Sequence, residues 1–290
     1  MAIDKINTTA WASIASVTGV AKASIANFNG VTAPAASSSG VVSDNLHVWF
    51  GPDDITGSTV NDKNGGSVTA TMSNGAAVVT SLRSAGSFYS DGANDIILSD
   101  MAPSAQPSTT AWPATLECWM YPPAGSRPLN IVVVNDPTSN LDWLRIYMDS
   151  RSGWGGTPTH NIHFQQYANG SGKWHRYTST SAYPTVNSSA WVHLCMTLEL
   201  TASDKTLITA YANGSELGTS LSTFTGSLNV PPWSNSPSSF NFGINHMQRD
   251  SASEGYYGES HVGDARLYVD ALTPAEILQN YNAEKASYGH

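Results

Sequence analysis

Short apolar and β-branched stretches recur at regular intervals along most of this sequence, and their recurrence constrains the fold more than any other feature. Turn residues separate them, as in Asn64-Gly65-Gly66, Pro122-Pro123 and Asn213-Gly214. Runs of this kind bounded by Gly, Asn and Pro are typical of strands, and about twelve in succession predict an all-β sandwich or barrel. The predicted strands are 45–50, 67–72, 87–90, 95–98, 115–121, 130–134, 143–148, 161–167, 191–200, 207–212, 240–244 and 261–268.

Two local signals add detail to this pattern. Asn213-Gly214 predicts a type I′ hairpin turn, because that turn needs positive φ at both positions. One helix is predicted near the C-terminal end, where Thr273 suits the N-cap, Pro274 the first helical position, and Glu276 completes a capping box. We expect the helix to run to about residue 286 and to cover a sheet edge or brace the N-terminal segment.

The first forty residues differ from the rest and divide the chain into an arm with its linker, 1–40, and a sandwich domain, 41–290. Residues 13–20 recur as 24–31, and each copy is a small apolar cluster followed by a Gly turn. Two copies are too few for a self-standing stack, so we expect the arm to order only against its own sandwich or another protein. The sequence does not decide between helix and strand for these units. The docking candidates in the arm are Ile14, Val17, Val20, Ile25, Phe28 and Val31.

Charge and composition exclude several functions. The net charge is −9 and the 13 Lys and Arg residues are scattered singly, which argues against binding to nucleic acid or docking to anionic membranes. No apolar run approaches the roughly 18 residues that span a bilayer, so membrane insertion is not expected. Residues 1–9 lack the pattern of a signal peptide, which predicts synthesis in a cytoplasm. The two cysteines, Cys118 and Cys195, are expected to be buried thiols, with a disulfide left open.

Five sequence marks occur in the order found in a known family. They are Phe88-Tyr89-Ser90-Asp91-Gly92, residues 116–122, Trp191-Val192-His193 with the hairpin tip Asn213-Gly214, Phe242-Gly243, and residues 261–268 followed by 271–277. Over about residues 46–281 the sequence resembles laminin-G-like domains of the concanavalin A-like lectin/glucanase type. The resemblance implies a concanavalin A-like jelly-roll β-sandwich with a short N-terminal arm and one C-terminal helix, a scaffold for binding rather than catalysis.

The repeat in the arm is similar to short leaders on virion proteins of tailed phages, marine and cyanobacterial phages among them. This second resemblance implies a virion surface protein, a homo-oligomer whose arm contacts other virion proteins. Two positions on the virion compete: a tail-fibre or tail-tip component that recognises a host-surface glycan, and a capsid decoration protein. A third interpretation is a cellular lectin or polysaccharide-active enzyme.

Catalysis is not expected, and no catalytic residue is predicted. Retaining glycosidases that have this fold resemble one another in a strand with the pattern Glu-x-Asp-x-(x)-Glu, in which the two catalytic carboxylates lie about 5 Å apart. None of the seven Glu stands in that pattern, and position 119, two residues after Glu117, is Trp. Asp264 and Arg266 alternate with apolar residues in a strand and are expected to form a structural pair or to bond loop backbone.

The segment 140–183 concentrates aromatic and His residues and predicts a glycan-binding surface. Aromatic rings stack on sugar C–H groups, while Asn, Asp and His bond the hydroxyls. The alternative is that Trp143 belongs to the core and that the others wedge loops or contact neighbouring subunits. The glycan-binding candidates are Trp143, Trp154, Trp174, Tyr177 and His175.

A calcium site is the one metal centre that the laminin-G resemblance suggests, with Asp91, Asn94 and Asp95 as its candidate ligands. Calcium prefers carboxylate and carbonyl oxygens of this kind. The favoured alternative is that Asp91 and Asp95 fix turns by hydrogen bonds to backbone. No cofactor is therefore expected.

Overall fold

The structure is a computed structural model of the 290-residue chain. It describes residues 40–290 except 92–94, 102–112, 122–128, 136–142, 150–160, 169–172, 179–189, 203–204, 222–239, 245–246, 250–251 and 255–258, and it places four short strands within residues 1–39. In this described part of the chain, no helix is long and apolar enough to cross a membrane.

All twelve predicted stretches form strands, which confirms the all-β class. The strands after the arm are β5 Leu46–Thr56, β6 Thr59–Asp62, β7 Thr69–Ser73, β8 Ala77–Val79, β9 Ser87–Asp91, β10 Ile96–Met101, β11 Ala114–Tyr121, β12 Leu129–Asn135, β13 Trp143–Asp149, β14 Asn161–Ala168, β15 Lys173–Thr178, β16 Val192–Ala202, β17 Lys205–Ala212, β18 Ser215–Leu221, β19 Phe240–Ile244, β20 Met247–Arg249, β21 Ala252–Glu254 and β22 Glu259–Tyr268. Strand β15 falls where the sequence predicted loop, and it completes one edge of the sheet.

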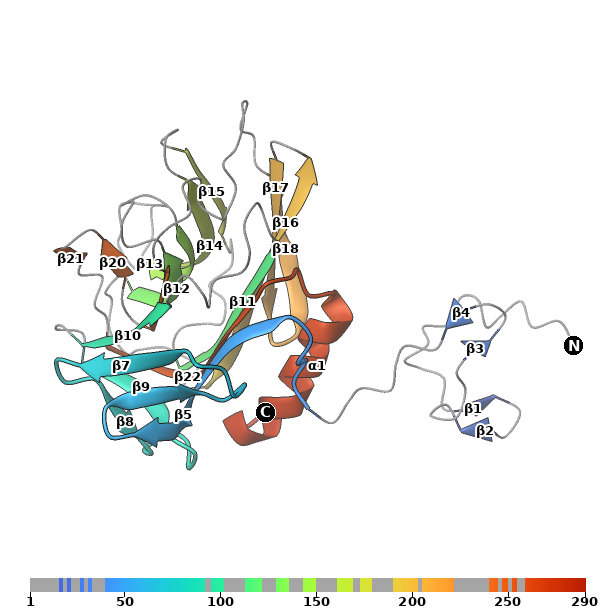
Figure 1. The fold of residues 1–290 in the computed structure, drawn as a ribbon. Helices are drawn as coiled ribbons and strands as arrows, with labels where there is room; N and C mark the ends of the chain where they lie inside the picture. Colours follow the sequence, from blue (N-terminus) through green and yellow to red (C-terminus); the bar gives the residue numbers. More distant parts are fainter. Residues whose placement is uncertain are drawn as a thin grey trace, which may run out of the picture.

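The paired strands form one long ladder that folds over into two layers (Figure 1). The first layer has the order β15-β14-β13-β12-β19-β10-β7, and the second has the order β5-β22-β11-β16-β17-β18, with β6 between the two. Apolar side chains of both layers meet in a single core, where Phe50 of β5 lies 5.6 Å from Phe242 of β19 between ring centroids. This arrangement is the jelly-roll sandwich that the sequence predicted.

Strand alternation gives each layer an inner face on the core and an outer face. On β13, Leu144 and Ile146 are buried in the core. Because successive side chains of a strand point to opposite faces, Trp143 and Arg145 lie on the outer face of the first layer. The two outer faces carry the polar groups described below.

Helix α1, Pro274–Glu284, and the short 3-10 helix η5, Lys285–Tyr288, cover the outer face of the second layer (Figure 1). Ile277 packs there against Cys195, Tyr211 and Tyr268. The predicted capping box is confirmed, since the Thr273 hydroxyl accepts from the Glu276 amide and the Glu276 carboxylate accepts from the Thr273 amide. The helix covers a sheet face, whereas the sequence analysis predicted that it would cover a sheet edge or brace the arm.

The predicted hairpin at Asn213-Gly214 joins β17 to β18. Both residues have positive φ, 50° for Asn213 and 73° for Gly214, as a type I′ turn requires. The Asn213 side chain also accepts a hydrogen bond from the His193 amide at 3.0 Å, which ties the turn to β16.

The eleven-residue repeat of the arm forms two equivalent strand pairs. Strand β1, Ser16–Val17, pairs with β2, Val20–Ala21, and β3, Asn27–Phe28, pairs with β4, Val31–Thr32. Corresponding strand residues are eleven positions apart, so the described residues of each copy form a pair of short antiparallel strands. The docking candidates Ile14, Val17, Val20, Ile25, Phe28 and Val31 have side chains outside the described residues.

The two cysteines are free and buried, as expected from the apolar runs around them. Cys118 belongs to the core on the inner face of β11, whereas Cys195 belongs to the cluster under helix α1 on the outer face of β16. Side chains on opposite faces of a sheet cannot be joined, so a disulfide between them is excluded.

Candidate functional site

The outer face of the first layer is lined with polar and aromatic side chains from five neighbouring strands. We call it the polar face. Its described members are Asn135 of β12, Trp143, Arg145 and Tyr147 of β13, His163 and Gln165 of β14, Arg176 and Thr178 of β15, and Asn241 of β19. This concentration of polar and aromatic side chains on one sheet face marks the candidate site.

Strand register arranges these residues in cross-strand rows. One row joins Asn241, Asn135 and Trp143, and continues through the positions of Tyr167 and Trp174. The next row joins Val133, Arg145, Gln165 and Arg176. Neighbouring strands lie about 4.8 Å apart, so each row is a nearly straight line of side chains across the sheet.

Arg145 occupies the centre of the polar face and is held on three sides. Its guanidinium carbon lies 4.1 Å from the ring centroid of Trp143 and 4.4 Å from that of Tyr147. Its Nε donates to Oε1 of Gln165 at 2.9 Å. Cation–π contacts to two rings and one hydrogen bond fix the planar group in a single orientation.

Imidazole and hydroxyl groups continue the face beyond Tyr147. The ring of His163 lies 5.7 Å from that of Tyr147, and its Nδ1 is 2.9 Å from the Thr178 hydroxyl. The row thus adds a group able to donate or accept hydrogen bonds beside an aromatic ring.

Burial divides the polar face into a floor and an upper part. The floor residues are each at most 9 % exposed, and they are Asn135, Trp143, Tyr147, His163, Gln165 and Asn241. Arg145, Arg176 and Thr178 are only half-buried. Burying amide and imidazole groups costs free energy unless they are hydrogen-bonded, and the floor is bonded within the chain, as between Gln165 and Arg145 and between His163 and Thr178.

Two predicted glycan-binding residues lie on the other side of the sheet. His175 of β15 pairs with Gln166, and its ring nitrogens lie 3.2 Å from the hydroxyls of Thr206 and Ser220. Tyr177 donates from its hydroxyl to the Leu217 carbonyl at 2.9 Å. Both side chains therefore close the edge of the sandwich between β15 and the second layer, and neither lies on the polar face.

We expect His175 to make the sandwich sensitive to mild acid. Burial lowers the pKa of His175 from 6.5 to about 4. Between these values the unfolded chain binds a proton that the folded chain does not, so the free energy of unfolding should fall by about 2 to 3 kcal/mol as the pH falls from 7.5 to 4.5. Urea unfolding of the full chain and of His175→Gln at both pH values isolates the contribution of His175, because glutamine does not titrate. Equal losses of stability in the two proteins would contradict it.

The remaining glycan-binding candidates are Trp143, Trp174 and Trp154. Trp143 is 9 % exposed and packs against Val133 under Arg145, so it is a floor residue with little open ring surface. Trp174 takes its place on β15 opposite Tyr167, and its side chain lies outside the described residues, as does all of Trp154. The sequence analysis selected single aromatic residues, whereas the structure presents cross-strand rows of polar and aromatic side chains.

Two of the calcium candidates, Asp91 and Asp95, are in contact with each other. The Asp95 carboxylate is buried and accepts a hydrogen bond from the Asp91 amide, while Asp91 is exposed. Burial raises the pKa of Asp95, and the charge of Asp91 adds to this effect. Asn94 lies outside the described residues. Calcium binding at this turn stays a prediction.

Arg145, Tyr147, Gln165 and Arg176 were missed by the sequence analysis, although a signal for Arg145 and Tyr147 was present. In the run Trp143–Asp149 every second residue is polar or aromatic, and the residues between are Leu, Ile and Met. That alternation identifies a strand with one face off the core. Arg176 had no such signal, since its strand follows a Gly-rich stretch.

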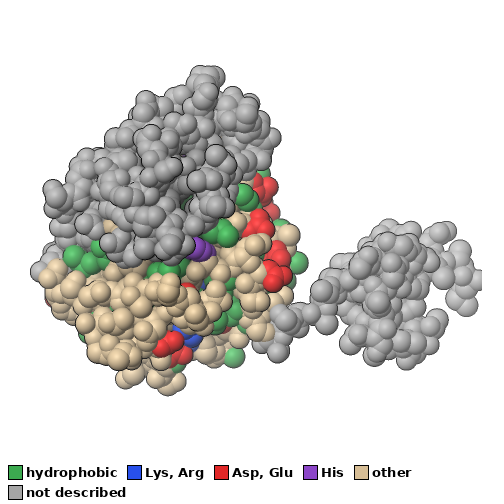
Figure 2. All heavy atoms as spheres, in the orientation of Figure 1, with side chains coloured by type: hydrophobic (Ala, Val, Ile, Leu, Met, Phe, Trp, Pro, Cys, Tyr) green, Lys and Arg blue, Asp and Glu red, His purple; other side chains and the backbone are tan. Residues whose placement is uncertain are grey.

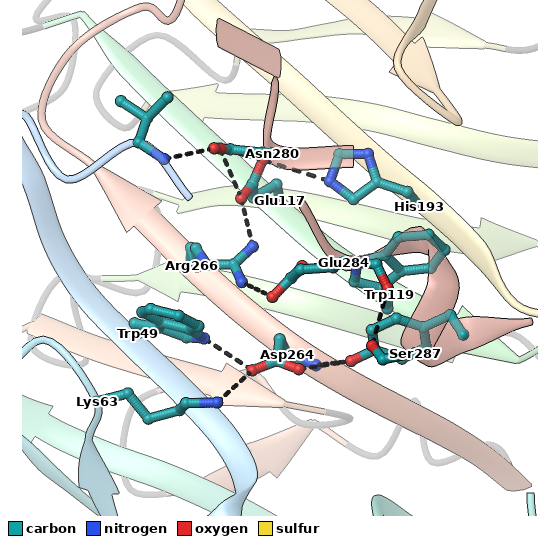
Figure 3. Close-up of polar contacts among 12 residues, drawn as sticks. Trp49, Lys63, Glu117, Trp119, His193, Asp264, Arg266, Asn280, Glu284 and Ser287 are labelled. Carbon is teal, nitrogen blue, oxygen red and sulfur yellow. Dashed lines mark hydrogen bonds and ion pairs between the residues drawn. The ribbon is translucent and has the colours of Figure 1, made fainter. Parts of the chain in front are cut away.

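A second cluster of polar groups lies between the second layer and helix α1 (Figure 3). Arg266 of β22 is fully buried, and its Nη1 donates to Glu117 Oε1 at 2.7 Å. Its Nη2 donates to Glu284 of α1. His193 of β16 lies 3.4 Å from the second oxygen of Glu117. We call these groups, with Asn280 and Asp264, the buried ion network.

Glu117 is held ionised at the centre of this network. Burial alone would raise the pKa of Glu117, but the hydrogen bond from His193 and the charge of Arg266 lower the pKa to about 2. Asn280 adds hydrogen bonds from its Nδ2 to both carboxylate oxygens, at 3.1 and 3.2 Å. A carboxylate with this pKa stays charged near neutral pH, where it binds Arg266 and Asn280 and so helps to dock the helix on the sheet.

Asp264 anchors the other end of the network. It accepts from the Trp49 indole at 2.8 Å and the Tyr288 hydroxyl at 2.6 Å, and it pairs with Lys63 and Arg83 at 3.1 and 3.2 Å. Asp264 and Arg266 were expected to pair with each other or with loop backbone. Instead, each bonds side chains that reach it from other elements.

The model of the concanavalin A-like lectin/glucanases superfamily, of the laminin G type, matches residues 91–278. A search of curated protein sequences finds no match.

Several solved structures share the fold. The binding domain of Paraclostridial Mosquitocidal Protein 1 has a TM-score of 0.54 and 14% identity, covering 83% of this chain and 52% of its own. The ligand binding domain of botulinum neurotoxin serotype D, solved with N-acetylneuraminic acid, gives 0.55 and 12%, covering 84% and 52%. Domain 4 of a GH43 extracellular arabinanase from Geobacillus stearothermophilus, solved with arabinotriose, gives 0.52 and 15%, covering 82% and 98%.

At these identities the structural likeness shows the fold alone, and the chain spans about half the length of the two toxin domains. The family model carries more weight, since it covers well over half of the residues and ends within helix α1. The chain belongs to the concanavalin A-like lectin/glucanase superfamily.

Proposed function

We propose that this chain is a non-enzymatic glycan-binding protein that holds sugar chains on its polar face. The observation that carries the proposal is the fixed guanidinium of Arg145 between Trp143 and Tyr147, over a buried floor of amide and imidazole groups. The half-buried groups above this floor are Arg145, Arg176 and Thr178, and side chains of this kind offer hydrogen bonds in defined directions to the hydroxyl groups of a sugar.

Two of the similar structures support carbohydrate as the ligand class. The arabinanase domain was solved with arabinotriose, and the serotype D domain with N-acetylneuraminic acid. Both sugars are bound by proteins of this fold.

The absence of catalysis is part of the proposal. The Glu-x-Asp-x-(x)-Glu strand of glycosidases has no counterpart in this sequence, and Glu117 is committed to the buried ion network. A polysaccharide-active enzyme is the competing function, and release of reducing ends from a bound polysaccharide would establish it.

Arg145→Met should abolish most of the binding while leaving the fold intact. Methionine keeps the length of the side chain but removes the charge, the ring contacts and the hydrogen bond to Gln165. We expect affinity to fall by about tenfold or more, because Arg held between aromatic rings is typical of binding hot spots. The measurement is a titration of the full chain with a panel of algal and bacterial polysaccharides, followed by Trp fluorescence.

Lys285→Met is the matched control. Lys285 also lies over an aromatic ring, at 5.6 Å from the Tyr281 centroid, but it lies in η5 on the other layer. It should bind like the unaltered chain. If no polysaccharide binds, or if both variants bind equally well, the polar face is not the site.

We further propose that the protein is displayed on a phage virion, as a tail-fibre or tail-tip component for host adhesion or as a capsid decoration protein. The two strand pairs of the arm, eleven residues apart, support a separate docking element of repeated units. Gold-labelled antibody against the protein, imaged on particles of the source lysate, tests this. Label on the tail supports host recognition, label over the capsid supports decoration, and label on neither contradicts a virion role.

A further inference from the structure

We propose that the outer face of the second layer carries a binding site for the phenol ring of a tyrosine side chain, and that the chain fills this site with its own residues 285–290 as a releasable latch. The occupant is Tyr288 of η5, which is 4 % exposed. We call the residues that surround its ring the tyrosine site. They are Trp119 of β11, Gly263 and Asp264 of β22, Trp191 just before β16, and Arg83.

Three side chains hold the ring of Tyr288. It is stacked on Trp119, with 4.1 Å between centroids and 6° between planes. Trp191 meets it edge-on at 5.0 Å, and the guanidinium carbon of Arg83 lies 4.0 Å from its centroid. Stacking, edge contacts and cation–π attraction all require a flat aromatic ring, so the site selects one.

The hydroxyl of Tyr288 is bonded twice by one residue. It donates to Oδ2 of Asp264 at 2.6 Å and accepts from the Asp264 amide at 2.7 Å. Gly263 makes room for the hydroxyl, because a Cβ at that position would overlap its oxygen. A phenol therefore fits the site better than a plain benzene ring does.

The walls of the tyrosine site are held by residues outside the latch (Figure 3). Asp264 also accepts from the Trp49 indole and pairs with Lys63, so release of the latch does not leave its charge without a partner. Trp119 donates from its indole to Glu284 of α1 at 2.8 Å. The site should consequently keep its shape when it is vacant.

The latch packs outside the main core. Tyr288 belongs to a separate cluster with Trp119 and Trp191, and that cluster shares no residue with the core between the layers. Within the latch only Tyr288 is buried. Opening a segment with so few buried groups costs less than global unfolding, so the latch can open while the sandwich stays folded.

Two buried donors beside Tyr288 bond no residue that the structure describes. They are Nε1 of Trp191, which is 5 % exposed, and Nε of Arg83, whose side chain is 8 % exposed. A buried donor without an acceptor costs free energy. The latch thus fills the aromatic part of the site only, which favours exchange with a phenol that brings acceptor oxygens.

Charge favours the closed latch. Residues 285–290 include Lys285 and His290 and no acidic side chain. Acidic side chains gather along the side of the described surface that carries β16–β18 and α1, the helix from which the latch continues (Figure 2). This attraction is weak and screened by salt, so it does not make closure permanent.

Gly263→Ala should release the latch. The added methyl group takes the space of the Tyr288 hydroxyl, while the strand geometry of residue 263 suits alanine. We expect trypsin to cleave after Lys285 about tenfold faster or more, because cleavage requires an open segment. Gly40→Ala is the matched control, since nothing lies within 4 Å of a Cβ there, and it should leave the rate unchanged.

Tyr288→Ala should leave a vacant site that takes p-cresol, the side chain of tyrosine. At saturation, p-cresol should raise the midpoint of thermal unfolding of this variant by about 2 °C or more, and toluene, which lacks the hydroxyl, by less. In the unaltered chain and in Tyr281→Ala the site is still filled by Tyr288, so the midpoint should rise by less than about 0.5 °C.

Several results would overturn the proposal. Equal cleavage of Gly263→Ala and Gly40→Ala, or loss of cooperative unfolding in Tyr288→Ala, would show that the segment does not open apart from the sandwich. A folded Tyr288→Ala whose midpoint p-cresol leaves unchanged would show that no phenol site exists. An equal rise in Tyr281→Ala would place the phenol elsewhere. None of these results bears on glycan binding at the polar face.

Discussion

Arg266→Met should destabilise the protein by about 3–5 kcal/mol, as expected when one partner of a buried ion pair is removed. Arg266 is fully buried, bonds Glu117 and Glu284, and stacks over Trp49 with 4.3 Å between the guanidinium carbon and the ring centroid. Methionine fills most of the volume but leaves two carboxylates without their cation. The measurement is the free energy of unfolding in guanidinium chloride at pH 7.

Neutralising Glu117 should recover part of the stability that is lost with Arg266. Without Arg266, the pKa of Glu117 should rise, so that Glu117 takes up a proton in mild acid. The stability difference between the variant and the unaltered chain should therefore shrink as the pH falls. Adding Glu117→Gln to Arg266→Met should recover part of the lost stability for the same reason. A loss below about 1 kcal/mol for the single variant would mean that the pair is not buried and that helix α1 is docked by apolar contacts alone.

Asn280→Asp should be nearly as damaging, although it changes one atom of the side chain. Asn280 is buried in α1, where its Oδ1 accepts from the Val42 amide at 2.7 Å and its Nδ2 donates to Glu117. Aspartate keeps the first bond but sets a second carboxylate against that of Glu117. One of the two must bind a proton or bear uncompensated charge, and we expect a loss of about 3 kcal/mol at pH 7.

Asn282→Asp is the matched control for this change. It lies two residues further along the same helix and is exposed. The same substitution there alters the net charge equally, yet it should change stability by less than about 0.5 kcal/mol. Equal effects at the two positions would show that net charge decides the result and not the contact with Glu117.

The sequence predicted the fold in detail because local signals and the global pattern agree in this chain. The capping box of Thr273 and Glu276 and the turn at Asn213-Gly214 are complete within a few residues, so no distant contact was needed to recognise them. The two-residue period of the strands likewise follows from burial of one face.

The candidate site was predicted only in part, for the opposite reason. The side of the sheet on which His175 lies depends on the register of β15 against β14. This register could not be predicted, because the sequence of β15 is typical of a loop. The centre of the polar face depends on Gln165 of β14 meeting Arg145 of β13, residues 20 apart in sequence. Pairings of this kind arise from the assembled sheet and leave no local mark.

The buried ion network could not be predicted from the sequence either. Glu117, His193, Arg266 and Glu284 come from four separate elements and converge only when helix α1 lies on the second layer. Asp264 and Arg266 were recognised as structural because they interrupt an apolar strand. Their partners could not be named without the fold.

The most direct test of the central claim is to locate a bound glycan on the protein. Hydrogen exchange of the backbone amides would be compared with and without the polysaccharide that binds most tightly in the panel. Binding at the polar face should slow exchange in β13, β14 and β15 and leave β16, β17 and helix α1 unchanged. Slowed exchange confined to the second layer, or to the turn at Asp91 and Asp95, would contradict the assignment of the polar face as the glycan-binding site.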